Sequence, residues 1–236
     1  MSAKVGVVFV SHSVQIAEGM VALAGQMAGS VALVAAGGTD DDGIGTSFAK
    51  VMSGVSEADG GAGVVVISDL GSALLTAETV LDMLDEEQRA RVRVIDVPFV
   101  EGGVAAAVAA ESGGSLDEVV AAAEGAVDAW AGAGAAGAAG PATSSAEPPS
   151  DGPYEREVLV RNPEGLHARP AAEFVKLANT FPAKVTVNGK DAKSLLGIMS
   201  LGLTAGSTAR IATDTPDGRP AVDALADLVD TGFGEV

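Results

Sequence analysis

The stretch 131–153 constrains the fold of this chain most, because it holds nothing large that a hydrophobic core could bury. It reads AGAGAAGAAGPATSSAEPPSDGP, which is alanine, glycine, proline and serine with a few other polar residues. Such a composition cannot offset the conformational entropy that is lost on folding. We therefore expect 131–153 to be a disordered linker between two domains, residues 1–130 and residues 154–236.

The first domain alternates apolar, β-rich runs with segments of helical spacing. The runs lie at 4–10, 31–35, 63–68 and 92–97, and apolar residues recur every three or four positions after them. This alternation is typical of parallel strands joined by right-handed helical crossovers. It predicts an α/β domain with an open, mostly parallel sheet that is covered by helices.

His12 is one of only two histidines in the chain, and it lies between the first apolar run and the following helix. Ligands bind at the carboxyl ends of parallel strands, and helix N-termini attract anions. Asp69 and Ser72 follow the third run in the same way, so we expect them to face His12 and to orient its imidazole. Capping of the next helix is an alternative role for both residues, and the two roles can coexist.

His167, the second histidine, directly precedes another predicted helix, in which Pro170 suits the first turn. Arg169 adds a positive fork that matches phosphate oxygens. This pattern favours a histidine that carries a phosphoryl group, with a capping histidine and a solvated arginine as the alternative. The order of strands and helices in 154–236, with a turn at Asn188-Gly189, predicts an α+β domain: an antiparallel sheet with helices on one face.

Composition narrows the function classes. The chain has no cysteine, so disulfides and thiolate metal sites are excluded, and the sequence offers no other cluster of metal ligands. Its net charge of −18, most of it in 1–130, argues against binding to nucleic acid. No run is long enough for a signal peptide or a membrane span, so we expect a cytoplasmic protein without membrane insertion.

Two motifs in the second domain resemble HPr, the histidine phosphocarrier of the bacterial phosphotransferase system (PTS). The stretch 162–171, NPEGLHARPA, resembles the HPr active-site signature, and 193–202, KSLLGIMSLG, resembles the segment around its regulatory serine. The resemblance covers about 154–236 and implies the HPr-like open-faced sandwich, with His167 as the phosphorylated residue. It also implies a possible regulatory phosphorylation at Ser194, although Ser194 would serve equally well as a helix N-cap.

Four short motifs in the first domain are similar to the mannose-type enzyme IIA domain. They are VSHS (10–13), GT (45–46), SDLGSA (68–73) and VEG (100–102), and they most resemble the first domain of the phosphotransfer subunit of PTS-dependent dihydroxyacetone kinase. This resemblance covers about 1–130 and implies a homodimer through this domain, with His12 phosphorylated. The side chains that we expect to stabilise the phosphate are Ser13, Asp69 and Ser72 here, and Arg169 in the second domain.

Together the resemblances imply a phosphotransferase that works as a relay. Enzyme I would phosphorylate His167, His167 would pass the group to His12, and His12 would deliver it to ADP on the ADP-binding subunit of dihydroxyacetone kinase. The group would travel as phosphohistidine, without a bound cofactor. Because some relatives carry an additional enzyme-I-like domain and this chain stops at Val236, we expect a separate enzyme I.

Two other functions stay open from the sequence. One is a sugar-specific IIA–HPr fusion that feeds a membrane transporter. The other is a phosphorylation-state sensor that binds a regulator instead of passing its phosphoryl group to a substrate.

Overall fold

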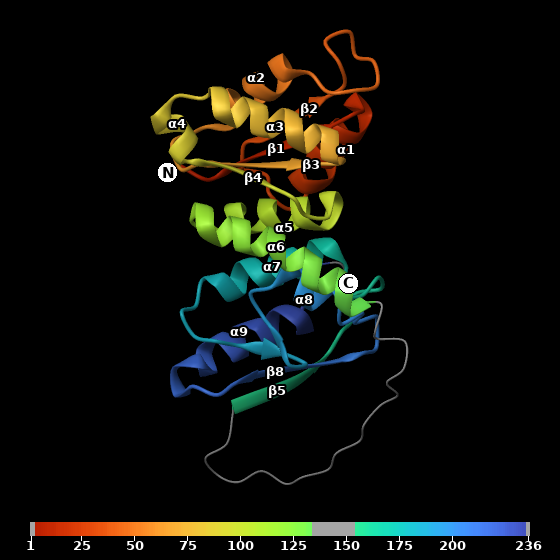
Figure 1. Ribbon diagram of the computed structural model, residues 1–236. Helices are drawn as coiled ribbons and strands as arrows, with labels where there is room; N and C mark the ends of the chain where they lie inside the picture. Colours follow the sequence, from red (N-terminus) through yellow and green to blue (C-terminus); the bar gives the residue numbers. More distant parts are fainter. Residues whose placement is uncertain (1–2, 134–153, 235–236) are drawn as a thin grey trace. The chain divides into compact units, whose positions relative to one another are not determined.

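The computed structural model describes residues 3–133 and 154–234, which fall into two compact units divided between Val127 and Asp128 (Figure 1). Each unit is described by itself. Most of the predicted linker 131–153 lies outside the described residues. Its first residues, 131–133, differ from the prediction because helix α6 continues to Ala133, as alanine is a strong helix former.

The first unit alternates strands and helices along the chain. In order these are β1 (Gly6–Ser11), α1 (Val14–Gly25), β2 (Leu33–Gly37), α2 (Phe48–Ala58), β3 (Val64–Ser68), α3 (Gly71–Met83), α4 (Glu86–Ala90), β4 (Val92–Ile95), α5 (Phe99–Glu111) and α6 (Leu116–Ala133), which continues past the division at Val127. The four strands form one sheet in the order β2-β1-β3-β4, with every pair parallel. The predicted α/β class is confirmed.

Helices cover both faces of this sheet, as Figure 1 shows. Val8 and Val10 of β1 belong to a buried cluster with residues of α2 and α3. On the opposite face, the ring of Phe9 meets the ring of Phe99 edge-on, with centroids 6.1 Å apart. Because both faces are covered, β1 is fully buried and its sequence is continuously apolar up to Ser11.

Glycine at position 37 lets β2 approach the loop that carries His12. A Cβ atom at Gly37 would lie 2.6 Å from the carbonyl oxygen of Ser13 and 2.8 Å from Cα of Val14. Real Cβ atoms do not tolerate such distances, so a larger residue would displace the loop. The end of β2 thus fixes the position of the segment that follows β1.

Several helix boundaries of the first unit differ from the sequence prediction. The sequence predicts Thr46 as the cap of a helix that ends near Gly54. In the structure, the Oγ of Ser47 accepts the hydrogen bond from the Lys50 amide, and α2 extends to Ala58. Helix α4 was not predicted. The sequence predicts a helix from Gly103, but α5 already begins at Phe99. Its two glycines are closely packed, Gly102 against Val97 and Gly103 against the ring of Phe9.

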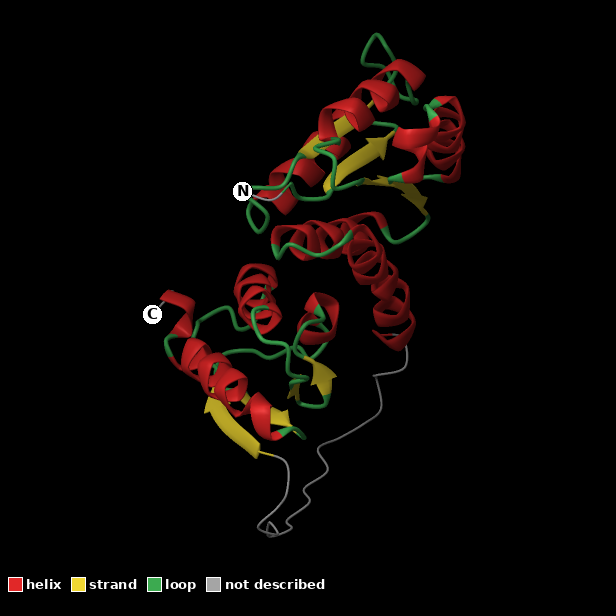
Figure 2. Cartoon of the chain, turned by 90° about the vertical axis from the view of Figure 1, so that its left-hand side faces the viewer, coloured by secondary structure: helices red, strands yellow, loops and turns green. Residues whose placement is uncertain are grey.

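The second unit consists of a small antiparallel sheet with helices. Its elements are β5 (Tyr154–Leu159), α7 (Ala168–Asn179), β6 (Thr186–Val187), β7 (Lys190–Asp191), α8 (Leu195–Met199), β8 (Thr208–Thr213), the 3₁₀ turn Pro216–Gly218, α9 (Arg219–Asp230) and the 3₁₀ turn Gly232–Gly234. The strand order is β5-β8-β6-β7 with every pair antiparallel. Figure 2 shows the strands with the helices packed against them, which confirms the predicted α+β class.

The turn predicted at Asn188-Gly189 joins β6 to β7. Asn188 has φ 47° and Gly189 has φ 83°, so both residues are left-handed, as a two-residue hairpin turn requires. The sequence predicts the first strand of this unit over 157–161, whereas β5 begins at Tyr154 and ends at Leu159. Its alternating exposure, with Val158 buried and Leu159 exposed, is that of a strand with one face open to water.

Candidate functional site

The ring of His12 is held between two side chains at the carboxyl edge of the parallel sheet. Its Nδ1 lies 3.0 Å from Oδ1 of Asp69, and its Nε2 lies 2.7 Å from Oγ of Ser72. Asp69 directly follows β3, the neighbour of β1, and Ser72 lies in the first turn of α3. The structure therefore brings together the three residues that the sequence predicted to face one another.

Asp69 accepts hydrogen bonds on both of its carboxylate oxygens. Oδ1 receives the His12 ring, while Oδ2 receives the His12 amide at 2.9 Å and Oγ of Ser11 at 2.8 Å. The alternative role of Asp69 and Ser72 as caps is not seen, because Leu70 occupies the N-cap position of α3 and no side chain caps the helix there. The hydrogen bonds of the Asp69 carboxylate thus all come from His12 and from Ser11 at the end of β1.

These contacts set the charge of Asp69. Burial acts to raise its pKa, but the hydrogen bonds from the His12 ring, the His12 amide and Ser11 outweigh burial, so the pKa lies below the ordinary value of 3.8. A carboxyl pKa that folding lowers contributes stability above the ordinary pKa, and this contribution is lost as the pH falls through the lowered value. The network is therefore intact at neutral pH.

An ionised Asp69 selects the tautomer of His12. A carboxylate only accepts hydrogen bonds, so in the neutral ring Nδ1 carries the proton and Nε2 keeps its lone pair. The hydroxyl of Ser72 can donate to that lone pair at 2.7 Å. The His12 side chain is one-fifth exposed, which leaves the ring accessible from solvent. The arrangement presents Nε2 as a nucleophile beside a hydroxyl donor and the free amides at the start of α3.

The predicted role of Ser13 with phosphate stays a prediction, and in the structure its hydroxyl contacts a neighbouring side chain. It donates to Oε1 of Gln15 at 2.9 Å, and the Ser13 amide donates to Oγ of Ser11 at 3.1 Å. Ser11, which sequence reasoning missed, contacts Asp69 directly. The sequence could not predict this contact, because a serine at the end of a buried strand is common whether or not it belongs to a functional site.

His167 occupies the N-cap position of α7. Its carbonyl accepts the amide of Ala171 at 3.0 Å, and its ring Nδ1 lies 3.1 Å from the carbonyl oxygen of Gly165. The ring therefore lies where the first amides of α7 lack intrahelical acceptors, as the sequence predicted. His167 is itself the N-cap of α7, whereas His12 lies one residue before Ser13, the N-cap of α1.

The loop before His167 is built around Gly165. Its carbonyl oxygen accepts from the His167 amide, the His167 ring and the side-chain amide of the buried Asn162, while its own amide donates to the Asn162 carbonyl. Asn162 was not predicted as a site residue, although an asparagine before a proline is a common turn signal. Asn162 thus stabilises the conformation of this loop through its two hydrogen bonds with the backbone of Gly165.

Replacing Gly165 by alanine is expected to destabilise the second unit by about 2–3 kcal/mol. Gly165 has φ +70°, and its Cβ would also collide with the backbone of Leu203 and Thr204. Gly189→Ala is the matched control, since φ is +83° and nothing lies within 4 Å, so only about 1 kcal/mol of conformational strain is expected. Urea unfolding of the whole chain, followed by NMR signals of the second unit, measures both, and equal losses would contradict the tight packing of Gly165.

Arg169 lies in the first turn of α7 with 66% of its side chain exposed. Its Nε is 3.8 Å from Oε1 of Glu173, one turn further along the helix. A pair this long and exposed holds the guanidinium weakly, so it is free to turn toward an anion at the helix N-terminus. Its predicted role with phosphate stays a prediction.

Changing Arg169 to alanine is expected to slow phosphoryl transfer through His167 roughly tenfold, since one charge-assisted hydrogen bond is lost. The thermal unfolding temperature should barely change, because an exposed residue at this position contributes little to stability. Arg210→Ala removes an arginine of similar exposure, on β8 and paired with Glu155, and serves as the control. Equal transfer rates in the two variants would mean that the Arg169 guanidinium is merely solvated.

Ser194 is the N-cap of α8, and its Oγ accepts a hydrogen bond from the Gly197 amide at 3.1 Å. The capping alternative is therefore seen in the structure. The side chain is exposed, as a modified serine would need, but regulation through Ser194 stays a prediction.

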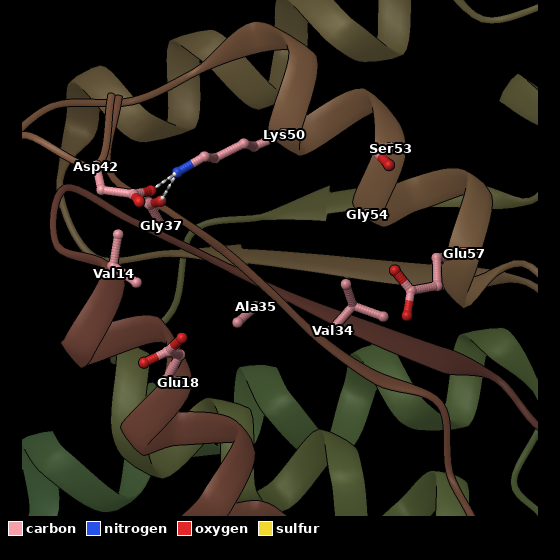
Figure 3. A pocket seen from close by; sticks show the side chains of 10 residues that line it. All are labelled: Val14, Glu18, Val34, Ala35, Gly37, Asp42, Lys50, Ser53, Gly54 and Glu57. Atoms are coloured by element: carbon pink, nitrogen blue, oxygen red, sulfur yellow. Dashed lines mark hydrogen bonds and ion pairs between the residues drawn. The ribbon is translucent and has the colours of Figure 1, made fainter. Parts of the chain in front are cut away.

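A groove of about 350 Å³ runs along the outer edge of β2, between α1 and α2. Figure 3 shows Lys50 reaching across one end of it, where Nζ donates to the Gly37 carbonyl at 3.0 Å and to Asp42 at 2.5 Å. Neither histidine lines this groove. The candidate site for phosphoryl transfer is therefore the edge of the sheet at His12, and this groove is separate from it.

Among the residues that the structure describes, no three His, Cys, Asp or Glu side chains gather as a metal ion would require. Within the same residues, no helix combines the length and the apolar character that crossing a bilayer demands.

Comparison with known proteins matches both units. Residues 6–120 match the family model described as "PTS system fructose IIA component", and residues 154–231 match "PTS HPr component phosphorylation site". The phosphoryl donor subunit DhaM of PEP-dependent dihydroxyacetone kinase from Escherichia coli (strain K12) is 36% identical over 98% of this chain and 51% of its own length. The DhaM subunit of kinase 2 from Listeria innocua is 36% identical over 44% of this chain and 84% of its own length. The phosphocarrier protein HPr of Cupriavidus necator is 42% identical over 34% of this chain and 96% of its own length.

Fold, histidine positions and family models define the class: a phosphotransferase-system protein in which an enzyme IIA domain is followed by an HPr domain. Within this class, the chain belongs to the DhaM family of phosphoryl donor subunits. It spans about half the length of the curated relatives that it matches from end to end.

Proposed function

We propose that this chain relays a phosphoryl group from His167 to His12 and onward to dihydroxyacetone kinase. The observation that carries the proposal is the His12 ring held by Asp69 at Nδ1 and by Ser72 at Nε2. A histidine that only capped a helix would need neither partner. A histidine that must attack phosphorus with one defined nitrogen needs its proton fixed on the other nitrogen, which is what Asp69 does at Nδ1.

The transfer to His12 balances as follows. The lone pair of Nε2 forms a bond to phosphorus while the N–P bond of phosphorylated His167 breaks, and the His167 nitrogen keeps that electron pair. Positive charge develops on the His12 ring, and the ionised Asp69 at 3.0 Å stabilises it. Ser72, released from Nε2, can then donate to a phosphoryl oxygen, together with the free amides at the start of α3.

At the first station, His167 receives the group beside the N-terminus of α7. The amides there and the exposed Arg169 are placed to neutralise charge on the three phosphoryl oxygens. The contact of Nδ1 with the Gly165 carbonyl holds the resting ring in one orientation. Both phosphorylated histidines in this proposal, His12 and His167, therefore rely on the same feature, an imidazole beside the N-terminus of a helix.

The partners follow from family membership and are part of the proposal. The relatives are named phosphoryl donor subunits of PEP-dependent dihydroxyacetone kinase, which supports phosphoenolpyruvate as the source of the group. We propose enzyme I, charged by phosphoenolpyruvate, as the donor to His167. The acceptor from His12 is ADP on the kinase's ADP-binding subunit, which phosphorylates dihydroxyacetone. We also propose a cytoplasmic homodimer through the first domain, without a resident cofactor.

An acceptor assay tests this function. The whole chain is charged with enzyme I and labelled phosphoenolpyruvate, and then mixed either with the kinase subunits and dihydroxyacetone or with the IIB component of a sugar transporter. Label is expected in dihydroxyacetone phosphate and not on the IIB component. Transfer to the IIB component alone would support a transporter function instead, and transfer to neither would support a sensor.

A further inference from the structure

We infer that Ser11 is a positioning residue for the phosphoryl acceptor His12 and acts through the carboxylate of Asp69. The inference rests on the proposed function. Ser11 ends β1, its side chain is completely buried, and its Oγ donates to Oδ2 of Asp69 at 2.8 Å. It touches neither ring nitrogen of His12, so its effect must pass through the carboxylate.

The direction of the Ser11 hydroxyl is fixed by its two partners. The amide of Ser13 can only donate, and it lies 3.1 Å from Oγ. The carboxylate of Asp69 can only accept, so the single hydroxyl proton must point toward it. Ser11 therefore connects the carboxylate to the backbone of the loop that begins α1.

This connection restricts how Asp69 can turn. Oδ1 must stay in line with Nδ1 of His12 while Oδ2 is held by Ser11 and by the His12 amide. Without the Ser11 donor, the carboxylate keeps one backbone bond on Oδ2 and gains freedom to rotate about its Cβ–Cγ bond. The ring would then lose part of its preference for the tautomer with a free Nε2.

Packing alone does not explain a serine at this position. Every other residue of β1 is apolar or glycine and fully buried, and valine is the most frequent among them. Burying a hydroxyl carries a cost that a valine would avoid, unless the hydroxyl is used. Here its use is the bond to Asp69.

The experiment compares Ser11→Ala, Ser11→Thr and Ser68→Ala in the whole chain. Ser68 is also buried, and it ends the neighbouring strand β3 opposite Val10, so its replacement controls for loss of a buried hydroxyl at this sheet edge. One readout is the pair of ¹⁵N chemical shifts of the His12 ring without phosphate, which report the tautomer. The other is the rate at which label moves from His167 to His12 in rapid-quench mass spectrometry.

Ser11→Ala is expected to slow this transfer about tenfold, the loss that one hydrogen bond represents, and to move the ring shifts toward a mixture of tautomers. Ser11→Thr keeps the hydroxyl and should restore both, while Ser68→Ala should change neither. Should the alanine variant not fold, Ser11→Cys retains most of the volume with a weak donor and is expected to show the same defects in smaller measure.

Transfer rates and ring shifts that stay at their native values in Ser11→Ala, or in Ser11→Cys where the alanine variant does not fold, would overturn the inference. A threonine variant as slow as the alanine variant, although folded, would do the same. Absence of label on His12 in the unmodified chain would refute the relay instead, and the ring shifts would still decide the role of Ser11.

Discussion

Replacing His12 by alanine is expected to reduce phosphorylation of dihydroxyacetone by roughly 10³-fold or more, while His167 remains fully chargeable. The change removes the nitrogen that receives the phosphoryl group. The neighbouring side chains of Asp69 and Ser72 are partners of the His12 ring, and neither is a nucleophile comparable to an imidazole nitrogen. Charging is measured as acid-labile label on the second unit, and turnover as dihydroxyacetone phosphate formed with the kinase subunits.

The reciprocal variant, His167→Ala, is the control for this result. It should accept no label from enzyme I at either histidine, because the relay begins at His167. A His12→Ala chain that still supported normal turnover would refute the order of the two stations.

Asp69→Asn is expected to slow transfer to His12 by about 10²–10⁴-fold with little change in the folded structure. Asparagine has nearly the same shape, but its amide can donate to Nδ1, which moves the ring proton to Nε2 and removes the attacking lone pair. The charge that stabilises the phosphorylated ring is lost as well. The rate is measured by rapid quench, and folding by circular dichroism.

Ser72→Ala serves as the comparison for Asp69→Asn. It leaves Asp69 and the tautomer untouched and removes only the donor at Nε2, so a loss of about tenfold is expected. If Asp69→Asn were no slower than Ser72→Ala, the tautomer argument for His12 would be wrong.

The sequence predicted the main residues of the His12 site because their proximity follows from the order of strands in the sheet. His12 and Asp69 directly follow neighbouring parallel strands, and parallel strands end at one edge of a sheet. This was enough to expect Asp69 and Ser72 to face His12. The pattern could not show that Asp69 also accepts from Ser11, since that contact depends on how the strand ends are aligned.

Local rules failed where packing decided between similar residues. Thr46 and Ser47 are both common N-cap residues, and the structure shows that Ser47 is the one that accepts the Lys50 amide. The hydroxyl of Ser13 donates to Gln15 in the structure, and its predicted role with phosphate stays a prediction. Propensity ranks residue types, and it does not distinguish adjacent members of one type.

In the second unit, the motif around His167 identified the helix N-terminus and its Arg169 but not what shapes the loop. Gly165 was part of the motif, and its positive φ is a property that sequence can suggest. The part played by Asn162 requires a buried side chain folded back on the Gly165 carbonyl. Such a contact between two loop residues leaves no periodic signal.

The most direct test of the relay is the order in which the two histidines acquire phosphate. Enzyme I and phosphoenolpyruvate are mixed with the unmodified chain, the reaction is quenched at successive times, and the two sites are quantified by mass spectrometry under conditions that preserve phosphohistidine. The account predicts label on His167 first, followed by its appearance on His12 at the expense of His167. Label on His12 that precedes label on His167, or that arises in the His167→Ala chain, would contradict it.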